Sequence, residues 1–164
     1  MKLKATQSAL LATTLLASGA TLAGHANHVI STHLSADSLV GTAGAPDGKG
    51  HAHVFGIDGD PTTLCYVIQV EDIQMVPVGE GMAAHIHEAA AGSNGAPIAM
   101  LAGPEDGDAA DCLTEGEEGK FPTGEAGIVK RILENPEDFY INVHNPEYPA
   151  GAIRGQLMKA DHGR

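Results

Sequence analysis

Histidines are the residues in this sequence best suited to chemistry. His85 and His87 flank Ile86 within Met82–His87, a stretch that predicts a β-strand. Side chains alternate between the two faces of a strand, so both imidazoles are expected on one face, with Ala84 and Ile86 on the other. Because Ala84 and Ile86 are apolar, theirs is expected to be the core face and the histidines are expected outside.

A third histidine ends a second predicted strand, Phe139–His144. Ile141 and Val143 form its core-facing pair, so His144 is expected to point outward, beside Asn142. If the two strands are neighbours, three imidazoles converge on one outer surface.

Three neutral imidazoles suit copper or zinc, and ligand softness alone does not choose between these ions. We therefore predict a metal site made by His85, His87 and His144, with copper as the expected ion and zinc as the alternative. The competing interpretation is a set of ordinary exposed histidines without a metal, because surface strands often carry alternating polar residues.

A second pair with the same spacing, His51 and His53, shares its strand face with Phe55 and Ile57. That register predicts partly buried, hydrogen-bonded histidines at the end of the sandwich, with a role as additional ligands as the alternative. His33 lies near the predicted mature N-terminus, and the sequence assigns it no role.

Arg154 is expected to point outward from the last strand, opposite Ile153 and Leu157. It either pairs with a surface carboxylate or, with Asn142, supports the metal site and guides an anion to it. The sequence contains no GxSxG, phosphate-loop or HExxH motif, so it favours a binding protein over an enzyme.

Short β-branched and aromatic runs separated by glycine and proline predict an all-β sandwich or flattened barrel. Helical spacing of apolar residues predicts one short helix, Glu125–Glu134, and the acidic stretch Gly103–Gly124 is expected to be a long surface loop. The seven predicted strands are Val29–Ser35, His51–Ile57, Leu64–Asp72, Met82–His87, Pro97–Leu101, Phe139–His144 and Ala152–Met158.

The 164 residues suffice for one domain, predicted over residues 27–164 with a core over about 30–158. Residues 1–26 have Lys2 and Lys4 ahead of an apolar run and then small residues, the order of a secretory signal peptide. The run is shorter than the roughly 20 apolar residues of a membrane span, so no insertion is expected after its removal. The predicted location is therefore secreted or periplasmic.

The net charge of −12 disfavours nucleic acids and anionic membranes as partners, since both require clustered basic residues. In an oxidising compartment Cys65 and Cys112 are expected to form one disulfide. A thiolate metal site is the alternative, and neither cysteine has a ligand neighbour at the usual spacing.

Two long stretches of the chain resemble the CHRD (chordin-type) family. They are 84–97, with AHIH and GSNGAP, and 135–157, with NP, YINVH and PAGAIRGQL; Phe55–Asp58, Leu64 and Tyr66 add an earlier block. The resemblance implies a Greek-key, immunoglobulin-like or superoxide-dismutase-like β-sandwich of about seven or eight strands with one short helix. Members occur as repeats in the extracellular antagonist chordin and as single secreted bacterial domains, so it also implies export.

The histidine pattern has a weaker resemblance to the copper site of Cu/Zn superoxide dismutase, in which an HxH strand and a distant histidine hold copper. No histidine lies between His87 and His144, so the metal-bridging histidine and the zinc site have no counterpart. Three hypotheses follow: a non-enzymatic copper-handling domain, a copper-dependent redox enzyme with Arg154 steering superoxide, and an extracellular protein-binding or matrix module without metal.

Overall fold

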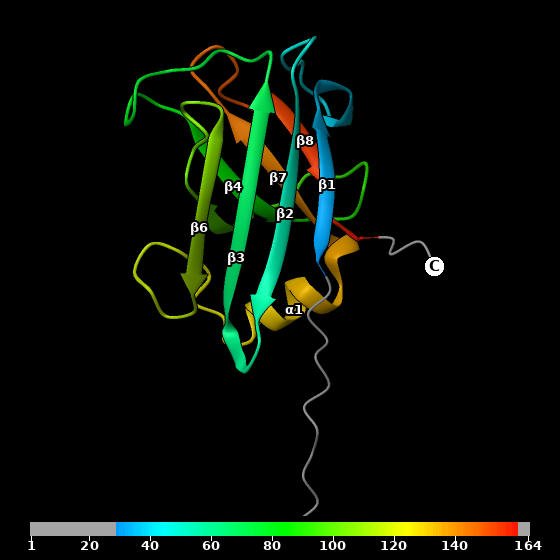
Figure 1. Cartoon of the computed structure of the whole chain (residues 1–164). Coiled ribbons are helices and arrows are strands. Elements are labelled where there is room, and N and C mark those ends of the chain that lie inside the picture. The colour runs from blue at the N-terminus through cyan, green and yellow to red at the C-terminus, as the bar shows by residue number, and fades with distance from the viewer. Residues whose placement is uncertain (1–28, 161–164) are drawn as a thin grey trace, which may run out of the picture.

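Within residues 29–160, nine antiparallel strands form one hydrogen-bonded sheet that folds into two facing layers (Figure 1). The computed structural model describes residues 29–160, so the predicted signal peptide lies outside the described residues. The strands are β1 (Ile30–Ser35), β2 (Lys49–Ile57), β3 (Asp60–Glu71), β4 (Ala83–Glu88), β5 (Pro97–Leu101), β6 (Asp108–Thr114), β7 (Phe139–His144), β8 (Ile153–Gln156) and β9 (Met158–Lys159).

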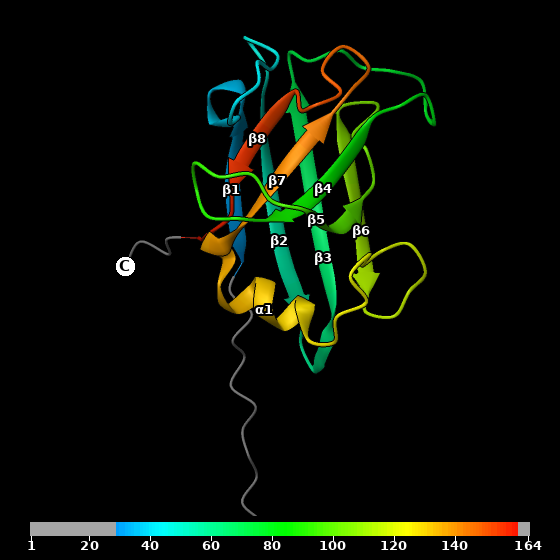
Figure 2. The same ribbon diagram turned by 180° about the vertical axis from the view of Figure 1, so that it is seen from behind.

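The strand order β5-β4-β7-β8-β1-β2-β3-β6 places non-consecutive strands side by side, as in a Greek key. One layer holds β1, β2, β3 and β6, and the other holds β4, β5, β7 and β8 (Figures 1 and 2). The layers join where β8 pairs with β1 through Arg154 and Ser35. The all-β sandwich expected from the sequence is therefore confirmed.

Alternating apolar residues from both layers fill the space between them. Ile30, Val54 and Ile68 from one layer and Ile86 and Ile141 from the other are fully buried. Each fully buried side chain of this size contributes roughly 1.5–3 kcal/mol, so this alternation fixes which face of each strand turns inward.

The helix α1 (Ile128–Glu134) closes one end of the sandwich (Figure 1), where Ile128, Val129 and Ile132 are buried. Both carboxylate oxygens of Glu115 accept backbone N–H groups of its first turn, from Gly127 (2.8 Å) and Val129 (2.9 Å). The predicted helix is confirmed, although it begins three residues later than expected. Short 3-10 turns lie at Ala36–Ser38 (η1) and Pro136–Asp138 (η2).

The expected long loop Gly103–Gly124 is wrong in its centre, because β6 lies within it and pairs with β3 from Gln69 to Thr63. β6 is at the edge of the sheet and buries only Leu113, so its sequence lacks the apolar alternation of a strand. Its pairing with β3, rather than its own composition, makes it a strand.

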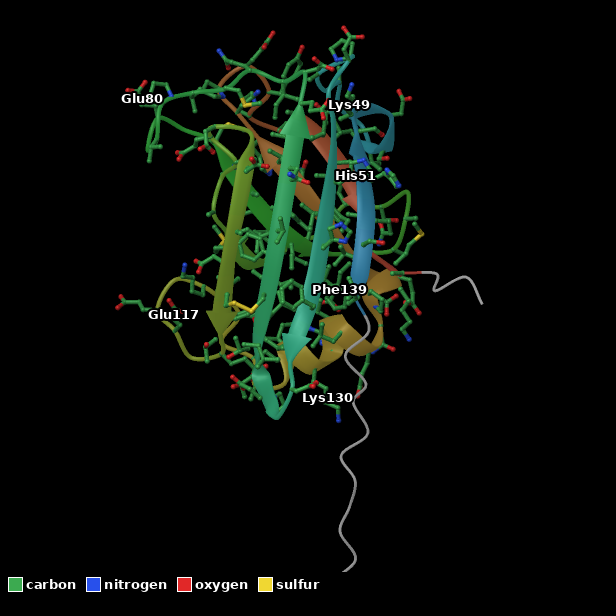
Figure 3. The ribbon with its side chains drawn as sticks, in the orientation of Figure 1. Lys49, His51, Glu80, Glu117, Lys130 and Phe139 are labelled. Carbon is green, nitrogen blue, oxygen red and sulfur yellow. A yellow bond between two sulfur atoms is a disulfide. The ribbon has the colours of Figure 1, made fainter. Side chains whose placement is uncertain are left out.

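Cys65 and Cys112 face each other across β3 and β6 and form the predicted disulfide, with an S–S distance of 2.02 Å. Figure 3 draws it as a yellow bond between these two strands. No helix within residues 29–160 is long and apolar enough to cross a bilayer.

Candidate metal centre

The two strands that carry the predicted ligands are neighbours, as the proposed site requires. β4 pairs with β7 so that Ala83 is opposite His144 and His85 is opposite Asn142. Their inward neighbours are fully buried in the core, so all three histidines stand on the outer face of this layer. His85, His87 and His144 are called the triad below. Their predicted outward orientation is confirmed.

The triad is close enough to share one ion. One ring nitrogen from each histidine can be chosen so that the three lie within 4.8 Å of one another. The centroid of the His85 ring lies 5.1 Å from that of His144 and 5.7 Å from that of His87. Tetrahedral coordination with metal–nitrogen bonds of about 2.0–2.1 Å separates the ligand nitrogens by roughly 3.4 Å. The nitrogens of the triad would therefore have to approach one another by about 1.4 Å or less to bind one ion.

Backbone carbonyls fix two of the rings. The Nδ1 atom of His87 lies 2.9 Å from the carbonyl oxygen of Gly95, and that of His144 lies 3.1 Å from the carbonyl oxygen of Pro149. A carbonyl only accepts hydrogen bonds, so each Nδ1 is the donor and each neutral ring keeps the lone pair on Nε2. Both Nε2 atoms are buried and have no hydrogen-bond partner within residues 29–160.

The surroundings keep the triad neutral. Burial, together with charge repulsion from His144 and then His87, lowers the pKa of His85 to about 4. Burial also lowers the pKa of His87 and of His144, although the bond to Gly95 or Pro149 opposes the shift in each ring. At pH 7 all three rings are therefore uncharged and free to donate a lone pair.

Loops cover the outer face on which the triad stands, so the expected exposure of this surface is wrong. Figure 2 shows the segment between β4 and β5 crossing in front of β7 and β8. His87 is only 9% exposed and Asn142 only 6%. A pocket of about 340 Å³ remains between this segment and residues 39–42, and both His87 and His144 line it.

Arg154 projects from the outer face of β8 as expected, opposite Asn142, but the same segment buries it and leaves only 2% of its surface exposed. Its Nη1 and Nη2 atoms donate to Asn94 Oδ1 (2.9 Å) and to the carbonyl of Ser93 (2.8 Å). Within residues 29–160 no carboxylate forms an ion pair with it, so the expected surface salt bridge is also wrong. Ser93 and Asn94 of the covering segment therefore accept the guanidinium hydrogen bonds that a surface carboxylate was expected to accept.

Tyr140 connects Arg154 to the triad, a role that the sequence did not suggest. Its ring stacks on that of His87, with centroids 4.8 Å apart and planes 11° apart, and the Arg154 Cζ atom lies 3.4 Å from its centroid. Because β7 lies between β4 and β8, the phenol ring stands between imidazole and guanidinium. This stack holds His87 on the side that faces β7, where Tyr140 is its cross-strand partner.

Gly95 is a second residue that sequence reasoning missed. Its carbonyl holds His87, and its N–H donates to the Tyr140 hydroxyl at 3.2 Å. A Cβ atom here would lie 1.8 Å from the backbone oxygen of Glu88, so the close approach requires glycine. The available signal was its position in the stretch that resembles the CHRD family.

Asn142 lies between His85 and Arg154 in the strand register. Its Oδ1 atom is buried without a hydrogen-bond partner among the described residues. Asn142 therefore lies beside the triad, and the supporting role expected for it stays a prediction.

The second histidine pair lies in the other layer and does not join the triad. The predicted core-facing register of His51 and His53 is wrong: both are exposed, whereas Ala52 and Val54 between and beyond them are fully buried. Phe55 shares this outer face and is only half-buried, and Ile57 beyond it is 43% exposed, so these apolar residues do not mark the core face. Figure 3 labels His51 on β2.

His33, to which the sequence assigned no role, lies directly opposite His51 on β1. The two ring centroids are 4.2 Å apart. His33, His51 and His53 are called the β2 group below.

Comparison with known protein families gives one match, to the CHRD domain over residues 30–157. Neither the curated proteins nor the solved structures gave a match. The matched residues include every strand from β1 to β8, the triad, and the segment that covers it. The chain therefore belongs to the CHRD family.

Proposed function

We propose that this CHRD domain binds a transition-metal ion, copper in preference to zinc, through one nitrogen each of His85, His87 and His144. The observation that carries the proposal is the pair of buried, unpartnered Nε2 atoms on His87 and His144. A buried acceptor without a partner costs about 1–3 kcal/mol, and a bound cation would remove this cost at two positions at once.

The hydrogen bonds of the triad support a metal role over a structural one. Metal-binding histidines usually donate their second ring N–H to a carbonyl or carboxylate, which fixes the tautomer and orients the ring. His87 and His144 make such bonds to Gly95 and Pro149. The lowered pKa values add that no proton has to be displaced when the ion binds at pH 7.

Titration with Cu²⁺, followed by electron paramagnetic resonance, tests the proposal. The wild type is expected to bind one equivalent tightly with nitrogen hyperfine structure, and both His85→Ala and His144→Ala are expected to lose this signal. His53→Ala is the matched control, since it removes an exposed histidine of the other layer. Unchanged stoichiometry and spectra in both triad variants would reject the site.

We also propose that the domain acts outside the cytoplasm. The disulfide between Cys65 and Cys112 supports this location, because such bonds persist in oxidising compartments. Fractionation of cells that produce the full chain should recover the protein outside the cytoplasm, without residues 1–26. Recovery of the uncleaved, reduced chain from the cytoplasm would reject it.

The pocket beside His87 and His144 supports a second candidate, a copper-dependent superoxide dismutase. One superoxide would be oxidised to O₂ and a second, with two protons, reduced to H₂O₂, so no outside reductant is required. Arg154 contributes little to steering in this arrangement, since its guanidinium is bonded to Ser93 and Asn94. Copper-loaded protein that dismutes superoxide no faster than free copper would remove this candidate.

A further inference from the structure

A methionine stands next to the triad on the neighbouring strand. β5 pairs with β4 so that Met100 is directly opposite His85. Its neighbours Ala99 and Leu101 are opposite Ile86 and Ala84 and are buried in the core. By the alternation of strand side chains, Met100 therefore projects from the same outer face as His85.

The backbone of Met100 is held on both sides, so this placement is firmly determined. One edge of β5 pairs with β4, and on the other edge the Met100 N–H donates to the carbonyl of Lys120 at 2.8 Å. A one-residue slip would expose Ala99 and Leu101 and bury the thioether in the core.

The thioether is within reach of an ion held by the triad. Residues directly opposite on antiparallel strands have Cβ atoms about 4.5–5.5 Å apart. A methionine side chain has three rotatable bonds, so its sulfur can move over its neighbour on the strand. Met100 is half-buried, which leaves it room to do so beside the desolvated His85 ring.

No other sulfur occupies an equivalent position within residues 29–160. Both cysteines are joined in the disulfide on the opposite layer. Met82 belongs to the hydrophobic core. Met75 is exposed outside the strands, and Met158 is exposed on β9. Only Met100 is in register with a triad histidine.

We propose that Met100 supplies the fourth donor of the metal centre and makes it a site for Cu⁺. Thioether sulfur is a soft ligand that favours Cu⁺, whereas imidazole binds zinc, copper, iron and nickel ions. This inference rests on the proposed function, because it assigns a metal and an oxidation state to the triad. It involves binding only, without electron transfer.

The test compares Met100→Leu with the wild type, using Met158→Leu as the control that removes an exposed sulfur far from the triad in the sheet. Cu⁺ affinity is measured by competition with bicinchoninate under anaerobic conditions, and Zn²⁺ affinity is measured by calorimetry. Met100→Leu is expected to weaken Cu⁺ binding at least tenfold, about 1.4 kcal/mol, and to leave Zn²⁺ binding within twofold of the wild type. Met158→Leu is expected to change neither.

X-ray absorption of the Cu⁺-loaded wild type provides a readout that does not depend on how a variant folds. A sulfur atom in the first coordination shell, absent from Met100→Leu, is expected. A wild-type shell of nitrogen alone, or equal Cu⁺ affinity in the two proteins, would overturn the role of Met100 and leave the triad intact. Failure of the wild type to bind Cu⁺, Cu²⁺ or Zn²⁺ would instead reject the proposed function.

Discussion

The triad and the β2 group lie on the outer faces of opposite layers and contain the same HxH spacing, yet their environments differ. The side chains of His51 and His53 are exposed, and His33 beside them is exposed too. His87 is covered by the segment between β4 and β5, and the carbonyls of Gly95 and Pro149 hold the rings of His87 and His144. The difference teaches that the same HxH spacing on a strand gives exposed rings in one layer and buried, oriented rings in the other, depending on the loops beside it.

Removing the disulfide should have the largest effect on the free energy of unfolding. It should leave metal binding, which belongs to the other layer, unchanged. Cys65→Ala with Cys112→Ala opens a link across 47 residues, and the chain-entropy relation gives a loss of about 4 kcal/mol. The disulfide joins β3 to β6, in the layer of the β2 group. Urea unfolding should show the loss, whereas the Cu²⁺ affinity of the folded double variant should match the wild type.

Exchange of the two HxH pairs for alanine tests the comparison itself. His85→Ala with His87→Ala should lower Cu²⁺ affinity by more than about 100-fold, roughly 3 kcal/mol. His51→Ala with His53→Ala removes the same number of imidazoles and should change it by less than about twofold. Calorimetric titration of both proteins measures this, and equal losses would show that burial does not distinguish the pairs.

Acid should weaken the metal-free protein through His85. Its pKa is about 4 in the folded chain against 6.5 as the ordinary value, so the unfolded chain takes up a proton first as the pH falls. The free energy of unfolding should therefore decrease from about pH 6.5 to pH 4, by at most about 3 kcal/mol from this group, and then level off.

Urea unfolding of His85→Ala tests this prediction, because this variant should flatten the decrease between pH 6.5 and 4. An identical slope in His85→Ala and the wild type would contradict the assignment to this ring.

The smallest of these effects is expected from the loop that covers the triad. Gly95→Ala places a Cβ atom against the Glu88 carbonyl and should cost about 1–3 kcal/mol, while moving the acceptor that holds His87. Gly92→Ala, in the same loop, meets no atom within 4 Å and strains only a backbone with φ of +80°. Thermal unfolding should show a larger loss of stability for Gly95→Ala than for Gly92→Ala. In Cu²⁺ titration only Gly95→Ala should weaken metal binding.

Several parts of the site could be predicted because strand alternation is local. The apolar residues around His85 and His144 were enough to place these rings on the outer face, and the structure agrees. The same method failed at His51, because the apolar Phe55 on its strand face is only half-buried and does not mark the core face. It also missed β6, whose single buried residue leaves no apolar period to detect.

The amino-acid sequence by itself determined the all-β class, the short helix, the disulfide partners and the face on which the triad stands. These follow from backbone periodicity and from the small number of possible cysteine pairs. Only the tertiary structure decided that β4 lies between β5 and β7, that Arg154 is buried against Asn94, and that Met100 stands beside His85. Strand pairing and loop placement depend on contacts between residues far apart in the chain, and a two-residue period carries no information about them.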